Sequence, residues 1–576
     1  MRCSIARSLG WLRRAVALSL AVNCAILIIP ILSKAQQIRA ASTQQQTLND
    51  AATLLQAGRL DEAEAAVRAY LRKSPRDASG HALLGVVLDQ RGREAEAEQS
   101  YTTALKLDPT NVAARSNLGV LLARTKRIDQ AIDMFEAVLR LDPTHAKASF
   151  NLGALYVARG DYARAIPLLE RVRNQQENQT GGTDVGLLIM LTGAYLHAGR
   201  MDDANRLADR IDQLAKNDAR TLFTLGLTLA EGQQYARAAQ LFERTNALRP
   251  QTYEVLYNLG IAYYNLEQLD KAAEALRSAA GLAPGEADPF YRLGLIASAM
   301  GDSKLALEYW SKAIELRPTF AEPNFMIGEE LLKRRVPESA ARFYARALEL
   351  DPAKLIYHIR LGVAYLRSQQ YQEGRAVFTR ALQRFPDDPN LYFLVGYAAR
   401  AEGQYDDAIA AFKRSLELKA DNPDVFTNLG FIAGQRGQDA EAERLLRQAI
   451  KLDADNFPAY HDLGRLLVKS KRYDEALPLL QRGAALNKED PGVHYQLFLA
   501  YSRLKRKTEA DRELAIFKQF EDARSHTPTP LGGSKPGMAA DDATTPPPLP
   551  AAAAGDGNKP PEPLRPGSTE GSAKRP

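Results

Sequence analysis

The apolar positions of this chain recur every three or four residues, which is the spacing of one face of an α-helix. They do so in pairs of amphipathic segments, each about 13 residues long, with a short turn between the two segments of a pair. Glycine occupies that turn in many pairs, where a positive φ costs glycine least: Gly58, Gly92, Gly160, Gly301, Gly403 and Gly437. The pattern predicts an all-α chain built from helix pairs.

The helix pairs repeat at a nearly constant length. A Leu-Gly dipeptide or a close variant marks each pair, and successive marker glycines are 34 residues apart, except for 40 after Gly153 and 33 after Gly193. Extending the frame by 34 residues reaches Ala51 at one end and Phe498 at the other, so we expect 14 repeats over residues 44–523. The marker glycines are Gly85, Gly119, Gly153, Gly193, Gly226, Gly260, Gly294, Gly328, Gly362, Gly396, Gly430 and Gly464.

Three further features recur in the repeat. A small residue, usually alanine, follows the marker after twelve positions, and a bulky residue such as Phe135 or Phe378 follows four positions later. The small residue lets two helices approach closely, and the bulky one fills the groove beside them. Proline ends eight repeats, where its missing N–H stops the second helix: Pro75, Pro109, Pro143, Pro250, Pro284, Pro318, Pro352 and Pro386.

This set of positions resembles the tetratricopeptide repeat, with the matching residues at the same offsets: Leu259, Gly260, Tyr263, Ala272, Leu276 and Pro284. The resemblance covers residues 44–523. It implies a right-handed superhelical solenoid of about 14 repeats, with first helices lining a concave groove and second helices on the outside. It also implies a scaffold that binds peptides or other proteins.

Two places depart from the regular repeat. Six extra residues fall near Asn174–Asp184, a polar stretch with two glycines, which predicts a looped insertion. It is either a lengthened surface connection, which costs little, or a hinge or partner-binding loop. The last helix, Thr508–Ala523, carries Leu514, Phe517 and Phe520 on one side, as expected of a helix that caps the array.

The amino terminus has the build of a secretory signal peptide. Four arginines within Met1–Arg14 precede the apolar run Ala15–Leu32, and small residues at Ser33 and Ala35 suit cleavage after Ala35. The apolar run could also span a bilayer, so an uncleaved anchor stays open as the alternative for residues 1–35. Either form predicts export to the periplasm or cell envelope of a bacterium, with membrane contact only through residues 1–35 if they are retained.

The remaining segments flank the repeats. Residues 36–43 are a linker, and residues 524–576 are a tail that holds 12 of the 30 prolines. The tail cannot bury enough apolar surface to fold, so we expect it to be disordered. Its run Pro546–Pro550 is either a docking motif for aromatic grooves or part of a plain spacer.

Charge and cysteine content narrow the choice of partners. The net charge is +6, and residues 1–35 contribute +5 of it, which leaves a nearly neutral body. Nucleic acid is therefore not the expected partner, because phosphate binding needs a basic patch. Both cysteines, Cys3 and Cys24, lie in the first 35 residues, so the body has no disulfide, thiolate metal site or cysteine nucleophile.

Motifs for catalysis are missing from the sequence. None of the seven histidines pairs at a metal-ligand spacing, and no Gly-Lys pair exists for a phosphate-binding loop. No Gly-x-Ser-x-Gly nucleophile elbow occurs either. We therefore predict no catalytic residue, no metal and no cofactor.

The best candidate for a binding site is the concave face of repeats six to nine. The position three before the marker holds Phe223, Tyr257, Tyr291 and Phe325, one aromatic residue per repeat. Such rings give a peptide a large contact area, but they could equally pack as core between first helices. By resemblance, Asn258 at the next position would hydrogen-bond the backbone of a bound peptide, and Arg292 occupies the same position one repeat later.

Together these features predict a non-catalytic protein–protein interaction scaffold of the bacterial cell envelope, with a protein or peptide partner in the groove. Three alternatives remain open. The chain could be a structural subunit of a secretion, pilus or exopolysaccharide-export assembly. It could be a carbohydrate-binding solenoid, since aromatic stripes also stack on sugars, or a periplasmic enzyme.

Overall fold

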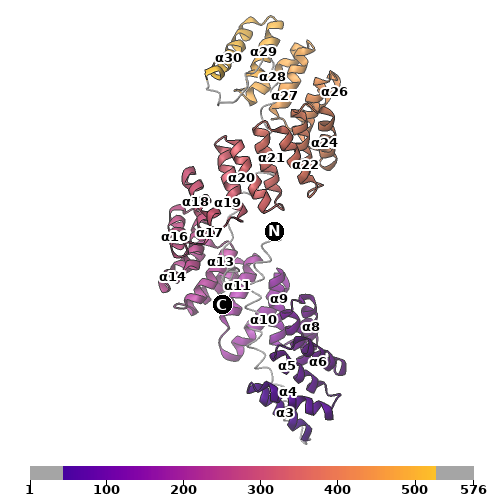
Figure 1. The fold of residues 1–576 in the computed structure, drawn as a ribbon, viewed down its shortest axis with the longest axis vertical. Helices are drawn as coiled ribbons and strands as arrows, with labels where there is room; N and C mark the ends of the chain where they lie inside the picture. Colours follow the sequence, from indigo (N-terminus) through magenta and orange to yellow (C-terminus); the bar gives the residue numbers. More distant parts are fainter. Residues whose placement is uncertain (1–42, 527–576) are drawn as a thin grey trace. The chain divides into compact units, whose positions relative to one another are not determined.

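The computed structural model describes residues 43–526. Within that range the chain forms 28 α-helices, α3 to α30, and no strand, which confirms the predicted all-α class. The chain divides into two compact units, and the boundary between them follows Ile296. The described residues of unit 1 are therefore 43–296 and those of unit 2 are 297–526, and helix pairs follow one another along each unit (Figure 1).

Odd-numbered helices are the first helices of the pairs. They are α3 (Thr43–Gln56), α5 (Ala78–Gln90), α7 (Val112–Arg124), α9 (Ala146–Arg159), α11 (Val185–His197), α13 (Ala219–Glu231), α15 (Tyr253–Asn265), α17 (Ala287–Ala299), α19 (Ala321–Lys333), α21 (Leu355–Arg367), α23 (Pro389–Ala401), α25 (Pro423–Gln435), α27 (Phe457–Lys469) and α29 (Pro491–Arg503).

Even-numbered helices are the second helices. They are α4 (Leu60–Lys73), α6 (Glu94–Leu107), α8 (Ile128–Leu141), α10 (Tyr162–Thr180), α12 (Met201–Leu214), α14 (Tyr235–Leu248), α16 (Leu269–Leu282), α18 (Ser303–Leu316), α20 (Pro337–Leu350), α22 (Tyr371–Leu382), α24 (Tyr405–Leu418), α26 (Asp439–Leu452), α28 (Tyr473–Leu486) and α30 (Lys507–His526).

The turn inside every helix pair contains one residue in the left-handed conformation. The predicted turn glycines have positive φ, for example +78° at Gly160 and +77° at Gly403. Where the repeat lacks glycine, another residue adopts the same conformation, such as Lys126 at φ +66° and Gln369 at φ +60°. The backbone geometry of the turn is thus common to all described pairs, whichever residue occupies it.

The marker glycine is required because a bulky side chain lies against it. A Cβ placed on Gly362 would stand 2.3 Å from the ring of Phe378, and one on Gly464 would stand 2.3 Å from Leu480. Each partner follows its glycine by sixteen positions and is fully buried. The spacing of marker and bulky residue therefore reflects direct contact between the two helices of a pair.

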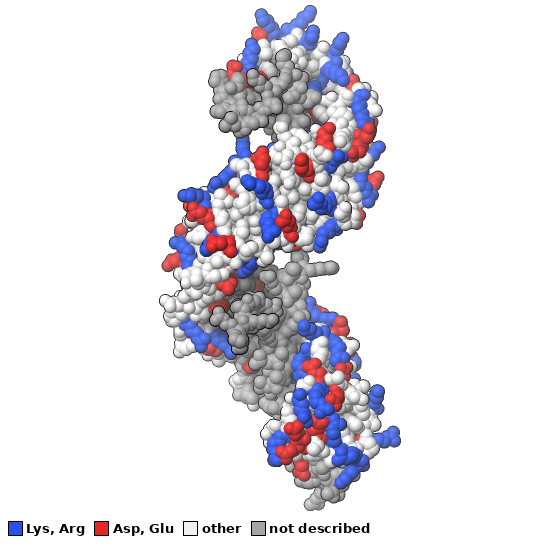
Figure 2. All heavy atoms as spheres, in the orientation of Figure 1, with Lys and Arg blue, Asp and Glu red and all other residues white. Residues whose placement is uncertain are grey.

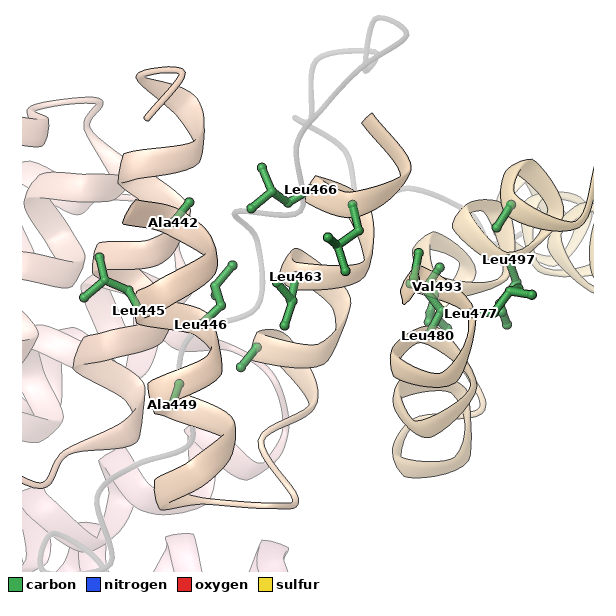
Figure 3. Packing of buried hydrophobic residues seen from close by; sticks show 14 of the residues in the cluster. Ala442, Leu445, Leu446, Ala449, Leu463, Leu466, Leu477, Leu480, Val493 and Leu497 are labelled. Carbon is green, nitrogen blue, oxygen red and sulfur yellow. The ribbon is translucent and has the colours of Figure 1, made fainter. Parts of the chain in front are cut away.

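Leucines and small residues form the core between neighbouring pairs. In unit 2, Ala442, Leu446 and Ala449 of α26 face Leu463 and Leu466 of α27 (Figure 3). Leu477 and Leu480 of α28 continue this cluster to Val493 and Leu497 of α29. Within this cluster each pair buries its apolar face against the next, as expected of repeats that are stable only as an array.

The insertion near Asn174–Asp184 corrects one expectation, because most of it is helix. Helix α10 continues to Thr180, and only four residues connect it to α11. The hydroxyl of Thr183 donates to the Glu177 carboxylate at 3.1 Å, and the N–H of Asp184 donates to the side chain of Gln176 at 3.1 Å. The extra residues thus lengthen a second helix whose end is held by hydrogen bonds.

The following pair, α11 and α12, is irregular. A Cβ on its marker, Gly193, would meet only the methyl group of Thr228, at 3.3 Å, and no bulky residue of α12. The position sixteen residues after Gly193 holds the exposed Asp209. Helix α11 packs directly on α13, and α12 has few contacts with α13.

Helix α30 ends the described array. Its Phe517 ring lies 5.2 Å from Tyr495 and its Phe520 ring lies 6.1 Å from His494, both on α29. This packing agrees with the expected capping helix, although α30 runs to His526, three residues beyond the predicted end. The predicted signal peptide (1–35) and the rest of the tail lie outside the described residues, as does the linker except for Thr43.

Charges of both signs are interspersed on the visible face of each unit (Figure 2). This agrees with the nearly neutral composition of the body. No helix within residues 43–526 combines the length and the apolar character needed to cross a membrane.

Candidate protein-binding surface on the first helices

Tyr257, the centre of the predicted aromatic stripe, is a core residue of unit 1. Only 1% of its surface is exposed, and its ring stacks on Tyr253 with 5.8 Å between centroids. The Nε of Arg292 donates to its hydroxyl at 3.3 Å. The phenol is therefore covered on its face and held at its polar end, so the core alternative holds for this ring.

Tyr291 and Arg292 lie on α17 and are half-buried. The guanidinium carbon of Arg292 lies 5.3 Å from the centre of the Tyr291 ring, while its Nε reaches Tyr257. Tyr264 completes the group: burial raises its pKa, and the nearby charge of Arg292 opposes that rise. Tyr257 and Tyr291 thus both contact the guanidinium group of Arg292. The structure therefore brings together three of the six predicted site residues.

Asn258 is buried and its amide is used inside its own helix. Its Nδ2 donates to the carbonyl oxygen of Glu254 at 2.7 Å, and only 1% of the residue is exposed. Its Oδ1 is buried and has no hydrogen-bond partner among the described residues. Asn428 repeats the same bond, from its Nδ2 to the carbonyl of Asp424 at 2.7 Å. These asparagines do not present their donor group to a ligand in this structure.

The two outer rings of the predicted stripe also make core contacts. Phe223 is half-buried and lies 5.6 Å from Phe242, between ring centroids. Phe325, which belongs to unit 2, is 7% exposed and lies between Tyr344 at 5.7 Å and Tyr357 at 5.0 Å. Tyr257 and Phe325 therefore present no open ring face, whereas Phe223 and Tyr291 are half-buried.

A different set of residues on the first helices of unit 2 forms a linked aromatic and basic group. The guanidinium carbon of Arg400, on α23, lies 4.7 Å from the centre of the Phe431 ring on α25. That of Arg465, on α27, lies 5.5 Å from the same ring. One half-exposed ring thus joins two arginines across three consecutive first helices through cation–π contacts.

Beside this ring is a pocket of about 280 Å³, which we call the Phe431 pocket. It exists because Gly434 has no side chain: a Cβ there would meet only the Cβ of Ala442, at 3.8 Å. Leu446 and Leu466, two of the buried residues labelled in Figure 3, make the lining apolar. The polar lining residues are Gln435, Asp462, Arg465 and Lys469.

Asp462 supplies the negative charge of the pocket. Burial opposes its ionisation, but His461 and Arg465 outweigh that effect, so the pKa of Asp462 is lowered. Its carboxylate lies 3.2 Å from Arg465 and 3.6 Å from the Nδ1 of His461. The pocket therefore combines an apolar interior with donors and an acceptor at its polar residues.

The sequence analysis placed the candidate site two and three positions before the marker glycine, so it missed Phe431, Arg465 and the pocket beside them. Phe431 and Arg465 each stand one position after a marker glycine, where eight of the twelve marker repeats have an aliphatic residue: Val86, Val120, Ala154, Ala194, Leu227, Ile261, Leu295 and Val363. Replacement of aliphatic side chains by an aromatic and a basic one in successive repeats is the signal that would have found the surface.

Among the described residues, no group of three or more His, Cys, Asp or Glu side chains is arranged to hold a metal ion. The histidine side chains that the structure describes have local partners. His358, for example, contacts the carbonyl oxygen of Pro352 through its Nε2 at 3.2 Å.

Several solved structures are similar to this chain, all with low TM-scores. Yeast Tom70 shares 17% identity over 78% of this chain and 99% of its own, with a TM-score of 0.30. MamA shares 27% identity over 28% and 94%, with 0.26. The Cut9–Hcn1 hetero-tetramer of APC/C shares 15% over 81% and 96%, with 0.32. No curated protein sequence matches significantly.

Family models of the tetratricopeptide repeat match most of the array. They match residues 50–112, 95–144, 126–181, 223–287, 287–320, 359–423, 399–466 and 459–492. Together these ranges cover more than half of the chain, and the helix pairs described above account for each of them. This fold supports a protein–protein interaction scaffold in general. The chain belongs to the tetratricopeptide-repeat family.

Proposed function

We propose that this protein is an exported, non-catalytic scaffold that binds a segment of a partner protein on the first helices of unit 2. The observation that carries the proposal is the Phe431 pocket with its two stacked arginines. Aromatic residues and arginine dominate the binding energy of protein interfaces. Here both types meet on three neighbouring helices, beside an apolar hollow.

The chemistry of the pocket suits one apolar side chain together with polar groups of the adjoining backbone. Leu446, Leu466 and the Phe431 ring would cover the apolar side chain. Arg465 and Lys469 can donate to carbonyl oxygens or a carboxylate, and Asp462 can accept an N–H. Such a mixture of an apolar centre and polar surroundings is typical of protein interfaces.

The export part of the proposal rests on the sequence of residues 1–35, which has the three regions of a signal peptide. A bacterial envelope location would place the partner there as well. A structural role in a secretion, pilus or exopolysaccharide-export assembly would also work through protein binding, and the identity of the partner decides between them. Carbohydrate binding is the less favoured alternative, since two rings of the predicted stripe, Tyr257 and Phe325, are buried and present no face to a sugar.

The proposal is tested by closing the pocket without disturbing the fold. Gly434→Leu fills the hollow, and Arg465→Gln removes one stacked charge; Gly281→Leu, at an exposed helical glycine with open space around it, is the matched control. Wild type and variants would capture partners from native envelope extract, and each captured protein would then be purified and titrated. We expect Gly434→Leu and Arg465→Gln to lose a partner that Gly281→Leu retains, with equal melting temperatures.

If all variants bind every purified partner with the same affinity, the Phe431 pocket is not the binding site. Sequencing of the mature amino terminus tests export separately: cleavage after Ala35 gives a chain that begins at Gln36. A chain that stays unprocessed in the cytoplasm of its own host would contradict export.

A further inference from the structure

A second hollow of unit 2 lies between second helices. It separates α22 from α24, has α23 beneath it, and encloses about 900 Å³; we call it the alanine groove. Its apolar lining includes Ala376 of α22, Val395 of α23 and Ala410 and Ala411 of α24. The Phe431 pocket, in contrast, opens beside α25 and α27, so the two sites share no lining residue.

Two alanines in consecutive repeats create this groove. Ala376 and Ala410 both stand fourteen positions after a marker glycine and are both exposed. Seven other repeats carry a long or charged side chain at that position: Gln99, Asp133, Gln240, Glu274, Glu308, Arg342 and Arg444. Methyl groups stand in place of such side chains in these two neighbouring repeats, so apolar surface is uncovered where those seven repeats are polar.

Positive charge lines the groove. Arg375 is already paired with Asp407 at 2.9 Å and with Glu402 at 3.0 Å. Arg414 is paired with Glu417 at 2.8 Å. Asp407 is the one acidic residue of the lining, and Arg375 neutralises it.

Arg380 differs from these two arginines. It is exposed, and no acidic side chain of the described residues lies within ion-pair distance of it. The field of Arg380 also reaches His358, whose pKa is lowered chiefly by burial and further by this arginine and Arg384. The groove therefore has one guanidinium whose charge is not compensated.

We infer that the alanine groove docks an acidic segment of a partner protein, as a surface separate from the Phe431 pocket. An apolar side chain of the segment lies on Ala376, Ala410 and Val395, and a carboxylate of the same segment pairs with Arg380. Opposite charges favour encounter and fix the register of such a complex. Nucleic acid fits less well, because the base of the groove is apolar and two of its three arginines are already neutralised.

The inference is tested by peptide selection on the full chain. Random short peptides displayed on phage would be selected on wild type and counter-selected on an Ala376→Arg, Ala410→Arg double variant. Arginine should be tolerated at both sites, since Arg342 and Arg444 occupy the same position in other repeats. Synthetic versions of the enriched peptides would be titrated against wild type, Arg380→Glu and a control, Arg346→Glu, which alters the same position one repeat earlier.

We expect the enriched peptides to combine acidic and apolar residues. Their affinity should fall at least tenfold, or about 1.4 kcal/mol, in Arg380→Glu and in the double variant, and stay unchanged in Arg346→Glu. Peptides without an acidic excess, or equal binding to all variants, would overturn the inference, as would an oligonucleotide that binds as tightly as the peptides.

Gly434→Leu separates the two sites. It should leave peptide binding to the alanine groove intact, so failure of the Phe431 pocket and failure of this groove give different results. Loss of the selected peptides in Gly434→Leu alone would place them in the Phe431 pocket and contradict the inference.

Discussion

A methyl group on Gly362 would stand 2.3 Å from the ring of Phe378, which is itself fully buried. Neither helix can absorb that contact without moving, so Gly362→Ala should destabilise the α21–α22 pair by about 1–3 kcal/mol, as overpacked cores do. Hydrogen exchange of these two helices measures the effect locally, which suits a repeat array whose pairs need not unfold together.

Gly281 provides the control for that prediction. It also lies in a helix, α16, but a Cβ there would meet no atom within 4 Å. Because alanine is the better helix former, Gly281→Ala should be neutral or stabilising by up to about 1 kcal/mol. Equal effects of the two substitutions would show that the contact with Phe378 does not explain the marker glycine.

Gln369 offers a prediction of opposite sign. It occupies the turn between α21 and α22 with φ +60° and is exposed. Because a left-handed conformation costs a non-glycine residue about 1–2 kcal/mol, Gln369→Gly should raise the stability of this pair by roughly 1 kcal/mol. The thermal melting midpoint reports the change. The exposed helical residue Gln372, changed to glycine, should instead lower it by about 1 kcal/mol, and a loss of stability in both variants would contradict the argument.

Tyr257 and Tyr291 should respond differently to truncation. Tyr257 is 1% exposed and accepts a hydrogen bond from Arg292, so Tyr257→Ala should destabilise unit 1 by about 3–5 kcal/mol. Changing the half-buried Tyr291 to alanine should lower the free energy of unfolding by less. Denaturant unfolding of both variants, followed by circular dichroism, makes the comparison, and equal losses would show that burial does not distinguish the two rings.

These residues also show how far the sequence could predict the site. The 34-residue spacing predicts which positions face a neighbouring helix, and the contact of Gly362 with Phe378 confirms it. It does not predict how much of a side chain stays exposed, because that depends on the size of its neighbours. Tyr257 is covered by Tyr253 and Arg292, whereas the Phe431 pocket is open because Gly434 has no side chain.

The insertion was mispredicted for a related reason. Polar residues and two glycines favoured a loop over Asn174–Asp184, but α10 extends through Thr180. Its added turn gains an ion pair between Glu177 and Arg210 of α12. A contact with a residue so distant in sequence overrides weak local propensity and cannot be inferred from the segment itself.

We expect the stability of α27, which carries His461 and Asp462, to depend on pH. Burial disfavours the charged form of His461, but the Asp462 carboxylate at 3.6 Å and Asp490 outweigh that effect and the repulsion from Arg465, so the pKa of His461 is raised. The pKa of Asp462 is lowered despite burial, mainly by His461 and Arg465.

The signs of these shifts define the window in which the pair stabilises α27. A raised histidine pKa gives stability that is complete below the unfolded value of 6.5 and is lost as pH rises through the folded value. A lowered aspartate pKa gives stability that is lost as pH falls through its folded value. The helix should therefore be most protected in mildly acidic solution, between the unfolded pKa values of 3.8 for aspartate and 6.5 for histidine, and less protected above the pKa of His461.

An NMR titration of the histidine rings tests this prediction directly. His461 should titrate above 6.5 in the wild type, and its pKa should fall in Asp462→Asn, where burial is no longer opposed by that carboxylate. Hydrogen exchange of α27 in the same variant should no longer show the loss of protection that the wild type shows as pH rises through the pKa of His461. The Asp462 carboxylate does not stabilise the charged form of His461 if the wild-type pKa of His461 is at or below 6.5. The same conclusion follows if this pKa is unchanged in Asp462→Asn. The charge of the pocket would then be independent of this histidine.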